Sequence, residues 1–185
     1  MSIVVALVII GIIVAIVGYI AATYNRLVGL RNKVNDQWSQ IDIELKRRFD
    51  LIPNLVSTVK GYTTHEKETL ENVVKARTAY LAAGTKEQAM DADKNLTSAI
   101  GRLFAVAEQY PELKANEQFM DLQKQLKDTE DKISFARKFY NDTALLLNNK
   151  IDMFPSNFVA KLFNFTKVEF FKADEAEKEN VKVEF

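Results

Sequence analysis

The stretch IVVALVIIGIIVAIVGYIAA, residues 3–22, contains no charged side chain, and Arg26 carries the first ionised side chain of the sequence. A helix rises about 1.5 Å per residue, so a run of this length covers the roughly 30 Å hydrocarbon core of a bilayer. The run therefore predicts a transmembrane helix, and we assign residues 1–24 to an N-terminal membrane anchor.

A cleaved signal peptide is the competing interpretation of this segment. It requires a basic region, an apolar core of about 7–15 residues and a cleavage site of small residues. Here only Met1 and Ser2 precede the run, the run is longer than such a core, and residues 21–23 form a weak cleavage site. We therefore expect a retained anchor.

The flanking charges predict the orientation of this anchor. Arg26, Arg31 and Lys33 follow the span, and no basic side chain precedes it. Because basic residues collect on the cytoplasmic side, we expect the N-terminus outside and the remaining chain in the cytoplasm. Tyr19 and Tyr24 fit the aromatic belt of the same membrane face.

Small residues recur within the span at spacings of four, three and four, which places them on one helical face. Such a face lets two helices approach closely and predicts a homo-oligomer. Glycine and alanine are also common in spans without this role, and both interpretations stay open. The candidate packing residues are Gly11, Ala15, Gly18 and Ala22.

The composition excludes several functional classes. The 185 residues carry 25 basic and 25 acidic side chains, so the net charge of zero gives no nucleic-acid footprint. The chain has no cysteine, which removes disulfides, thiol nucleophiles and cysteine-based metal sites. Beyond the anchor, the length is that of one ordinary domain.

Apolar residues after the span recur at steps of three and four, which indicates a helix that continues out of the bilayer. Pro53 has no N–H to donate, so we expect a kink or break near it, with helix resuming as far as Gly61. The residues of this stripe are Leu27, Leu30, Val34, Trp38, Ile41, Leu45, Phe49 and Ile52.

Three further helices are predicted. Two capping boxes, which satisfy free N–H groups at a helix start, predict helices over about 65–83 and from about 85 to Pro111. The boxes are Thr63 with Glu66 and Thr85 with Gln88. The last helix has apolar steps averaging about 3.5 residues, the spacing of a coiled-coil seam. Its stripe is Phe119, Leu122, Leu126, Thr129, Ile133, Ala136, Tyr140, Thr143, Leu147, Ile151 and Phe154.

The predicted fold is therefore all-α: an N-terminal transmembrane helix that continues into an antiparallel up-down four-helix bundle. The bundle domain covers residues 25–171 and ends in a Phe-rich segment, and residues 172–185 are a charged, mobile tail. We expect the segment to fold back and cap the bundle, although docking on a partner or lying in the membrane interface are alternatives. Its candidate interaction residues are Phe158, Phe163, Phe165, Phe170 and Phe171.

No catalytic template fits the sequence. His65 is the only histidine, so neither a zinc protease motif nor a di-iron bundle site can be assembled. Phosphate-binding glycine loops and nucleophile elbows are also missing from the sequence. We expect no enzyme activity, no metal, no cofactor and no small-molecule substrate.

The run Lys46-Arg47-Arg48 is the sharpest charge feature and a candidate site for headgroups or an acidic partner. The alternative is a solvated face in which Arg47 or Arg48 pairs with Asp50 or with a facing carboxylate such as Glu130. Four polar residues near the apolar stripes are expected to fix helix register by hydrogen bonding. They are Asn54, Arg137, Asn141 and Asn148.

These pieces together resemble the LemA family of bacterial membrane proteins over nearly the whole chain. The most specific match is Leu45-Lys46-Arg47-Arg48-Phe49-Asp50-Leu51-Ile52-Pro53-Asn54-Leu55-Val56, supported by Tyr24-Asn25-Arg26-Leu27-Val28, Tyr110-Pro111-Glu112-Leu113-Lys114-Ala115-Asn116 and Phe154-Pro155-Ser156-Asn157. The resemblance implies a single-span protein of the bacterial inner membrane, with a small external N-terminus and a helical-bundle domain. The resemblance implies no catalytic residue in this chain.

The sequence thus predicts a membrane-anchored, non-enzymatic helical scaffold that self-associates, with the lipid bilayer, other copies and a membrane protein as partners. The alternative is a regulatory adaptor that presents the helical domain to a membrane protease or an envelope-stress partner. An enzyme is the third and least supported hypothesis, because the searches for acid, base, nucleophile and metal ligands found nothing.

Overall fold

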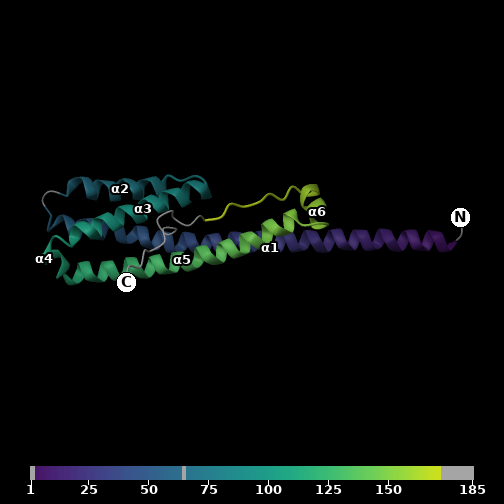
Figure 1. Cartoon of the computed structure of the whole chain (residues 1–185), viewed down its shortest axis with the longest axis horizontal. Coiled ribbons are helices and arrows are strands. Elements are labelled where there is room, and N and C mark those ends of the chain that lie inside the picture. Colours follow the sequence, from purple (N-terminus) through teal and green to yellow (C-terminus); the bar gives the residue numbers. More distant parts are fainter. Residues whose placement is uncertain (1–2, 64–65, 172–185) are drawn as a thin grey trace, which may run out of the picture. The chain divides into compact units, whose positions relative to one another are not determined.

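The computed structural model describes residues 3–63 and 66–171, and within these residues every regular element is a helix. The elements are α1 (Ile3–Lys60), α2 (Lys67–Leu81), α3 (Lys86–Ala107), α4 (Pro111–Lys114), α5 (Glu117–Asp152) and α6 (Ser156–Leu162) (Figure 1). The predicted all-α class is confirmed for this part of the chain. The predicted tail at 172–185 and His65 lie outside the described residues.

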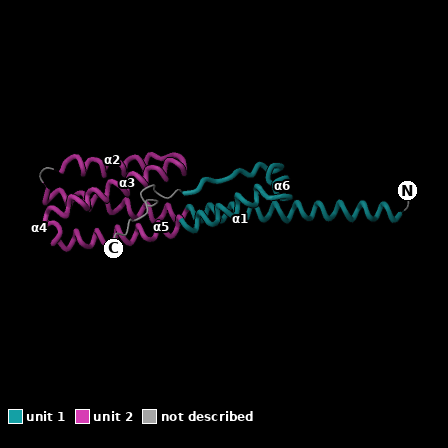
Figure 2. The backbone as a smooth tube through the Cα atoms, in the orientation of Figure 1, with its two compact units in different colours: residues 1–38, 138–185 teal, residues 39–137 magenta. Residues whose placement is uncertain are grey.

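The chain divides into two compact units (Figure 2). One consists of residues 1–38 with 138–185, here called the anchor unit. The other consists of residues 39–137, here called the distal unit. Helices α1 and α5 each contribute residues to both units. The domain boundaries predicted from sequence stay a prediction.

Helix α1 changes its environment at Thr23. The side chains of residues 3–22 are mostly exposed, whereas Thr23 is buried and begins a stripe that faces other helices. The predicted stripe is confirmed, with Leu30 and Trp38 half-buried and the others buried. The buried members are Leu27, Val34, Ile41, Leu45, Phe49 and Ile52.

Of the kink or break predicted near Pro53, the break is wrong, because α1 continues without interruption to Lys60, and the kink stays a prediction. Pro53 removes the N–H that would bond to the carbonyl of Phe49, four residues earlier. The guanidinium of Arg77 in α2 donates to that carbonyl instead, through Nε at 3.3 Å. A side chain from a neighbouring helix thus replaces the missing helical hydrogen bond.

The two predicted capping boxes have different outcomes. Thr85 is the N-cap of α3 and accepts from the N–H of Gln88 at 3.2 Å, as predicted. The box at Thr63 is wrong, since its hydroxyl donates to the carbonyl of Val59 at 3.1 Å. Glu66, the N-cap of α2, makes no side-chain cap and accepts instead from the hydroxyl of Tyr110. A local bond to the end of α1 therefore occupies Thr63, and a tertiary contact with Tyr110 occupies Glu66.

The predicted seam on α5 is the buried face of that helix. Phe119, Leu122, Leu126, Thr129, Ile133, Tyr140 and Leu147 are all buried. Burying a large apolar side chain contributes about 1.5–3 kcal/mol, so this face is a main source of stability in each unit. Phe154 is an exception, because it lies beyond the end of α5 and is 79% exposed.

Candidate interaction sites in the two units

In the anchor unit, the chain turns sharply after α6. Asn164 has a φ of 54°, the left-handed conformation that asparagine adopts more readily than most residues. The N–H of Phe165 bonds to the carbonyl of Ala160 at 2.9 Å, and the N–H of Asn164 bonds to that of Lys161 at 3.2 Å. These two bonds form a Schellman motif, which ends α6 and sends the chain into the non-helical stretch 165–171.

Two asparagines on α5 then hold that stretch by its main chain. Asn148 donates to the carbonyl of Val168 at 2.9 Å and accepts from the same residue's N–H at 3.0 Å. Asn141 makes the same pair of bonds with Phe171, both at 2.9 Å. Seven helical residues rise about 10.5 Å and three extended residues about 10 Å, so the two spacings match. We call this arrangement the asparagine clamp.

Ring contacts tie this stretch and Phe163 to α1, and Tyr140 of α5 adds one more. On α1 they begin at Tyr24, two positions after the apolar run, and extend to Trp38, which stacks on Phe171 with ring centroids 5.7 Å apart. The other contacts are Tyr24 with Phe163 (4.6 Å), Tyr24 with Phe165 (5.9 Å), the Arg31 guanidinium over Phe165 (5.1 Å) and Tyr140 with Phe171 (5.3 Å). Aromatic and cation–π pairs of this kind each contribute about 0.5–1.5 kcal/mol.

The Phe-rich segment therefore folds back along α1 and α5 within the anchor unit, and does not simply close an end of the helices. Phe165 and Phe171 are half-buried in this contact. Phe158, Phe163 and Phe170 keep much of their surface exposed. Asn141 and Asn148, predicted to fix register between helices, instead bind an extended main chain. Their spacing of seven was the signal in the sequence that could have indicated this role.

In the distal unit, a cluster of charged side chains from α1, α3 and α5 centres on the buried Arg48 and Asp93, and its other members are partly exposed. Arg48 is only 3% exposed, and its Nη1 lies 2.5 Å from Glu130 Oε2 and 3.5 Å from Asp93 Oδ1. The same nitrogen donates to the hydroxyl of Thr97 at 3.1 Å. Asp93 is fully buried and also pairs with Arg137. We call these residues the arginine cluster.

Burial lowers the pKa of Arg48 from its ordinary value, and the nearby charge of Glu130 partly opposes this effect. An arginine pKa is high enough that the side chain still carries its charge at neutral pH. The predicted pairing of Arg48 with Glu130 is confirmed, whereas the predicted solvated face is wrong for Arg48, which is buried. Asp93 was missed, although its place between Ala89 and Leu96 at helical spacing put it on the apolar face of α3.

Lys46 and Arg47 are exposed on α1, unlike Arg48. An external partner can therefore reach the first two, and Arg48 is committed to contacts within the unit. Whether Lys46 and Arg47 bind a partner stays a prediction.

The candidate packing residues of the span, Gly11, Ala15, Gly18 and Ala22, are all exposed. A methyl group added at Gly11 or Gly18 would meet no atom within 4 Å.

Among residues 3–63 and 66–171, no group of three or more His, Cys, Asp or Glu side chains could hold a metal ion. The charges of the arginine cluster are instead arranged as pairs.

These features define a class: an all-helical protein whose N-terminal helix is long and apolar enough to cross a membrane. A sequence model described as the LemA family matches residues 37–185, and the chain belongs to that family. The resemblance inferred from the sequence motifs is thereby confirmed.

The chain is similar in sequence to several named proteins. Protein LemA of Metamycoplasma hominis is 28% identical over 158 residues, which cover 85% of this chain and 72% of that protein. Magnetosome protein MamQ 1 of Paramagnetospirillum magneticum is 26% identical over 186 residues, covering 86% and 68%. Magnetosome protein MamQ of Magnetospirillum gryphiswaldense is 25% identical with the same coverage. None of these names states a reaction.

Proposed function

We propose that this protein is a membrane-anchored, non-enzymatic helical scaffold that self-associates. The observation that carries the proposal is the exposure of the apolar side chains from Ile3 to Ala22, followed by burial from Thr23 onward. Leaving large aliphatic side chains in water costs about 1.5–3 kcal/mol each, and a bilayer removes that cost. The bilayer, further copies and a membrane protein are the proposed partners.

The charges next to the span support the proposed orientation. Arg26, Arg31 and Lys33 all have exposed side chains, as expected for residues at the cytoplasmic headgroups. In this arrangement the N-terminus lies outside, α1 crosses a bacterial inner membrane within the anchor unit, and the chain beyond the span lies at the cytoplasmic face. We further propose that α1, α2, α3 and α5 form an antiparallel up-down four-helix bundle within the distal unit.

Labelling of introduced cysteines tests the orientation, because the chain has no cysteine of its own. Ser57 is exposed on α1 in the distal unit. We expect Ser57→Cys to resist a membrane-impermeant maleimide in intact cells and to react after lysis, and Ser2→Cys to react in intact cells. The reverse pattern would overturn the orientation.

Self-association is tested by the mass of the detergent-solubilised protein over a range of concentrations. The double variant Gly11→Leu/Gly18→Leu fills the small-residue face and is expected to weaken association by about tenfold or more. Its control, Ile9→Leu/Ile16→Leu, keeps residue volume and leaves that face intact. A wild-type protein that stays monomeric at every concentration would overturn self-association.

The adaptor hypothesis has its own support in the distal unit. A groove of about 630 Å³ lies between the end of α1 and α2, with apolar side chains flanked by charged ones. It is lined by Val56, Lys60, Thr63, Glu66, Lys67, Leu70, Glu71, Val74 and Lys75. Such a groove suits a short amphipathic segment of a membrane protease or envelope-stress partner.

A photo-crosslinker at Val74, which is exposed within the groove, tests this alternative. The control position is Leu81, which is exposed at the end of α2 outside the groove. The adaptor hypothesis predicts one membrane protein captured from Val74 and not from Leu81. Capture of only further copies of this chain would favour the scaffold.

A further inference from the structure

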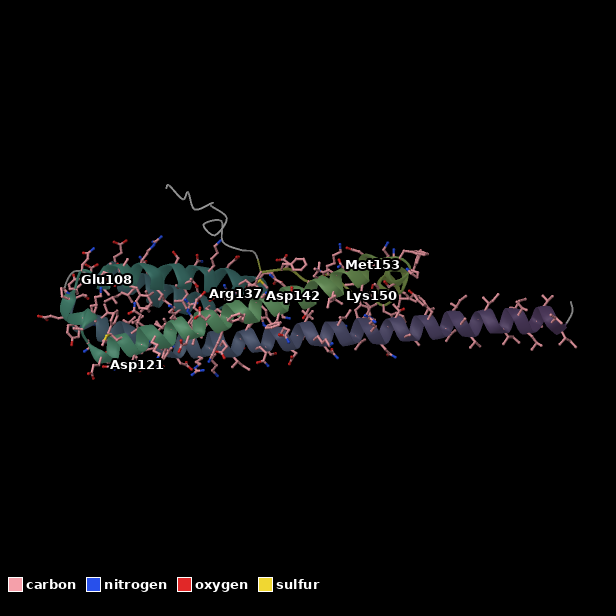
Figure 3. The ribbon with its side chains drawn as sticks, turned by 60° about the horizontal axis from the view of Figure 1, so that its bottom comes forward. Glu108, Asp121, Arg137, Asp142, Lys150 and Met153 are labelled. Carbon is pink, nitrogen blue, oxygen red and sulfur yellow. The ribbon has the colours of Figure 1, made fainter. Side chains whose placement is uncertain are left out.

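We propose that the turn between α5 and α6 inserts into the interface of the membrane that α1 spans. The inference rests on the proposed membrane anchor and adds a second point of contact with the lipid. The contact consists of four large apolar side chains, here called the apolar corner. They are Met153 (61% exposed), Phe154 (79%), Phe158 (65%) and Leu162 (65%), and Figure 3 labels Met153 at this turn.

Packing within the anchor unit does not account for these side chains. Helix α6 buries Ser156, Val159 and Ala160 on one face. Phe158 and Leu162 are four residues apart, so they lie together on a different face of the helix. That face is apolar and exposed, although a helix on the surface of a soluble protein normally presents polar residues there.

The position of the corner along α1 is set by a ring contact. Phe163, the residue after α6, lies against Tyr24 with ring centroids 4.6 Å apart. Tyr24 follows the last residue of the apolar run, Ala22, by two positions, or about 3 Å along the helix axis. Helix α6 therefore lies beside α1 at the boundary of the proposed membrane span (Figure 1).

The charges around the corner fit a membrane surface. Lys161 is exposed on α6, and no acidic residue occurs between Ser156 and Leu162. The acid nearest in sequence, Asp152, is paired with Lys167 at 2.7 Å. Phenylalanine and leucine next to a basic side chain are typical of segments that lie at the boundary of headgroups and acyl chains.

Lipid is favoured over a second copy as the occupant for two reasons. The corner lies at the same level as the end of the apolar run, so one bilayer covers both surfaces. Four side chains are also few for a protein interface, which usually takes about 20–30 residues from each partner. Membrane insertion covers the corner without any further contact area.

The test uses the full chain in vesicles of phosphatidylcholine and phosphatidylglycerol. Trp38 is the only tryptophan, so Trp38→Phe gives a background without tryptophan fluorescence. Phe158→Trp reports on the corner in this background. Phe135→Trp is the matched control, because Phe135 is 66% exposed and lies in the distal unit.

Lipids brominated close to the headgroup are expected to quench the Phe158→Trp variant about twofold more than the Phe135→Trp variant, since quenching requires contact with the acyl region. Equal quenching of both variants would overturn the proposal. Blue-shifted emission from the Phe158→Trp variant without quenching by bromine would also overturn it, because protein would then cover the corner.

Two further measurements control for misfolding of the Trp38→Phe background and for loss of the membrane anchor. Should Trp38→Phe disturb folding, Phe158→Cys and Phe135→Cys carrying an environment-sensitive dye replace the tryptophan variants, with the same expected difference. Carbonate extraction is run on the same vesicles and reports on the anchor alone. Retention in the membrane with an unquenched corner rejects only this inference, whereas release from the membrane rejects the anchor on which it rests.

Discussion

The distal unit buries charged side chains, whereas the anchor unit binds the main chain of its C-terminal stretch with neutral amides and keeps the Asp152–Lys167 ion pair at its surface. In the arginine cluster, Arg48 and Asp93 are almost fully removed from water and are compensated by Glu130 and Arg137. In the asparagine clamp, two amides bind main-chain groups, and aromatic rings together with the Arg31 guanidinium pack on the side chains of the same stretch.

The arginine cluster and the asparagine clamp differ in the free energy that is lost when a partner is removed. A buried ion costs several kcal/mol when its partner is lost, whereas an unsatisfied amide costs about 1–3 kcal/mol. The arginine cluster therefore makes the arrangement of α1, α3 and α5 in the distal unit nearly all-or-none. The asparagine clamp allows the stretch 165–171 to detach at a smaller cost.

The largest expected effect comes from breaking the arginine cluster. Arg48→Ala leaves Asp93 buried with one partner fewer, and we expect the free energy of unfolding to fall by about 3–5 kcal/mol. Chemical denaturation followed by circular dichroism measures this free energy of unfolding. The control Arg47→Ala removes an exposed charge from the next position and is expected to change stability by less than about 0.5 kcal/mol. Similar losses in both variants would contradict the role of the cluster.

The next effect comes from opening the asparagine clamp. Asn148→Ala removes both hydrogen bonds to Val168 and is expected to cost about 1–3 kcal/mol. Amide exchange should then accelerate at residues 168–171 while the distal unit keeps its protection. The neighbouring Asn149 is exposed, so Asn149→Ala serves as the control. Loss of protection throughout the chain would show that the clamp does not act locally.

A third test concerns Arg77, which replaces the helical bond lost at Pro53. Arg77→Ala is expected to cost about 1 kcal/mol in the natural chain. The cost should shrink when Pro53→Ala restores an N–H for the carbonyl of Phe49. A double-mutant cycle measured by denaturation gives this coupling. A coupling energy of zero would mean that Arg77 stabilises the unit through some other contact.

The smallest effect is a pH dependence in the distal unit. Burial and the hydrogen bond to Asp42 raise the pKa of Tyr80 above its ordinary value. Above about pH 10 the unfolded chain loses this proton while the folded chain keeps it, so the stability contribution is present below that pH and declines above it. Denaturation at pH 8 to 11 should show a steeper alkaline loss in the natural protein than in Tyr80→Phe. Parallel curves would count against this link.

Local sequence patterns determined much of this protein. The apolar run predicted a membrane-spanning helix, steps of three and four residues predicted the buried faces of α1 and α5, and the box at Thr85 predicted the start of α3. Each of these signals depends on residues within one or two helical turns, where the geometry of the helix fixes which side chains are neighbours.

Only the tertiary structure decided the rest. Helix α1 passes through Pro53 while Arg77 supplies a hydrogen bond from another helix, and the Glu66 half of the first capping box contacts Tyr110 instead. Asp93 joins Arg48 across 45 positions, and Asn148 joins Val168 across 20. The sequence offers each of these groups several partners, and the choice follows from which helices pack together, because a buried polar group must be satisfied by whatever lies beside it.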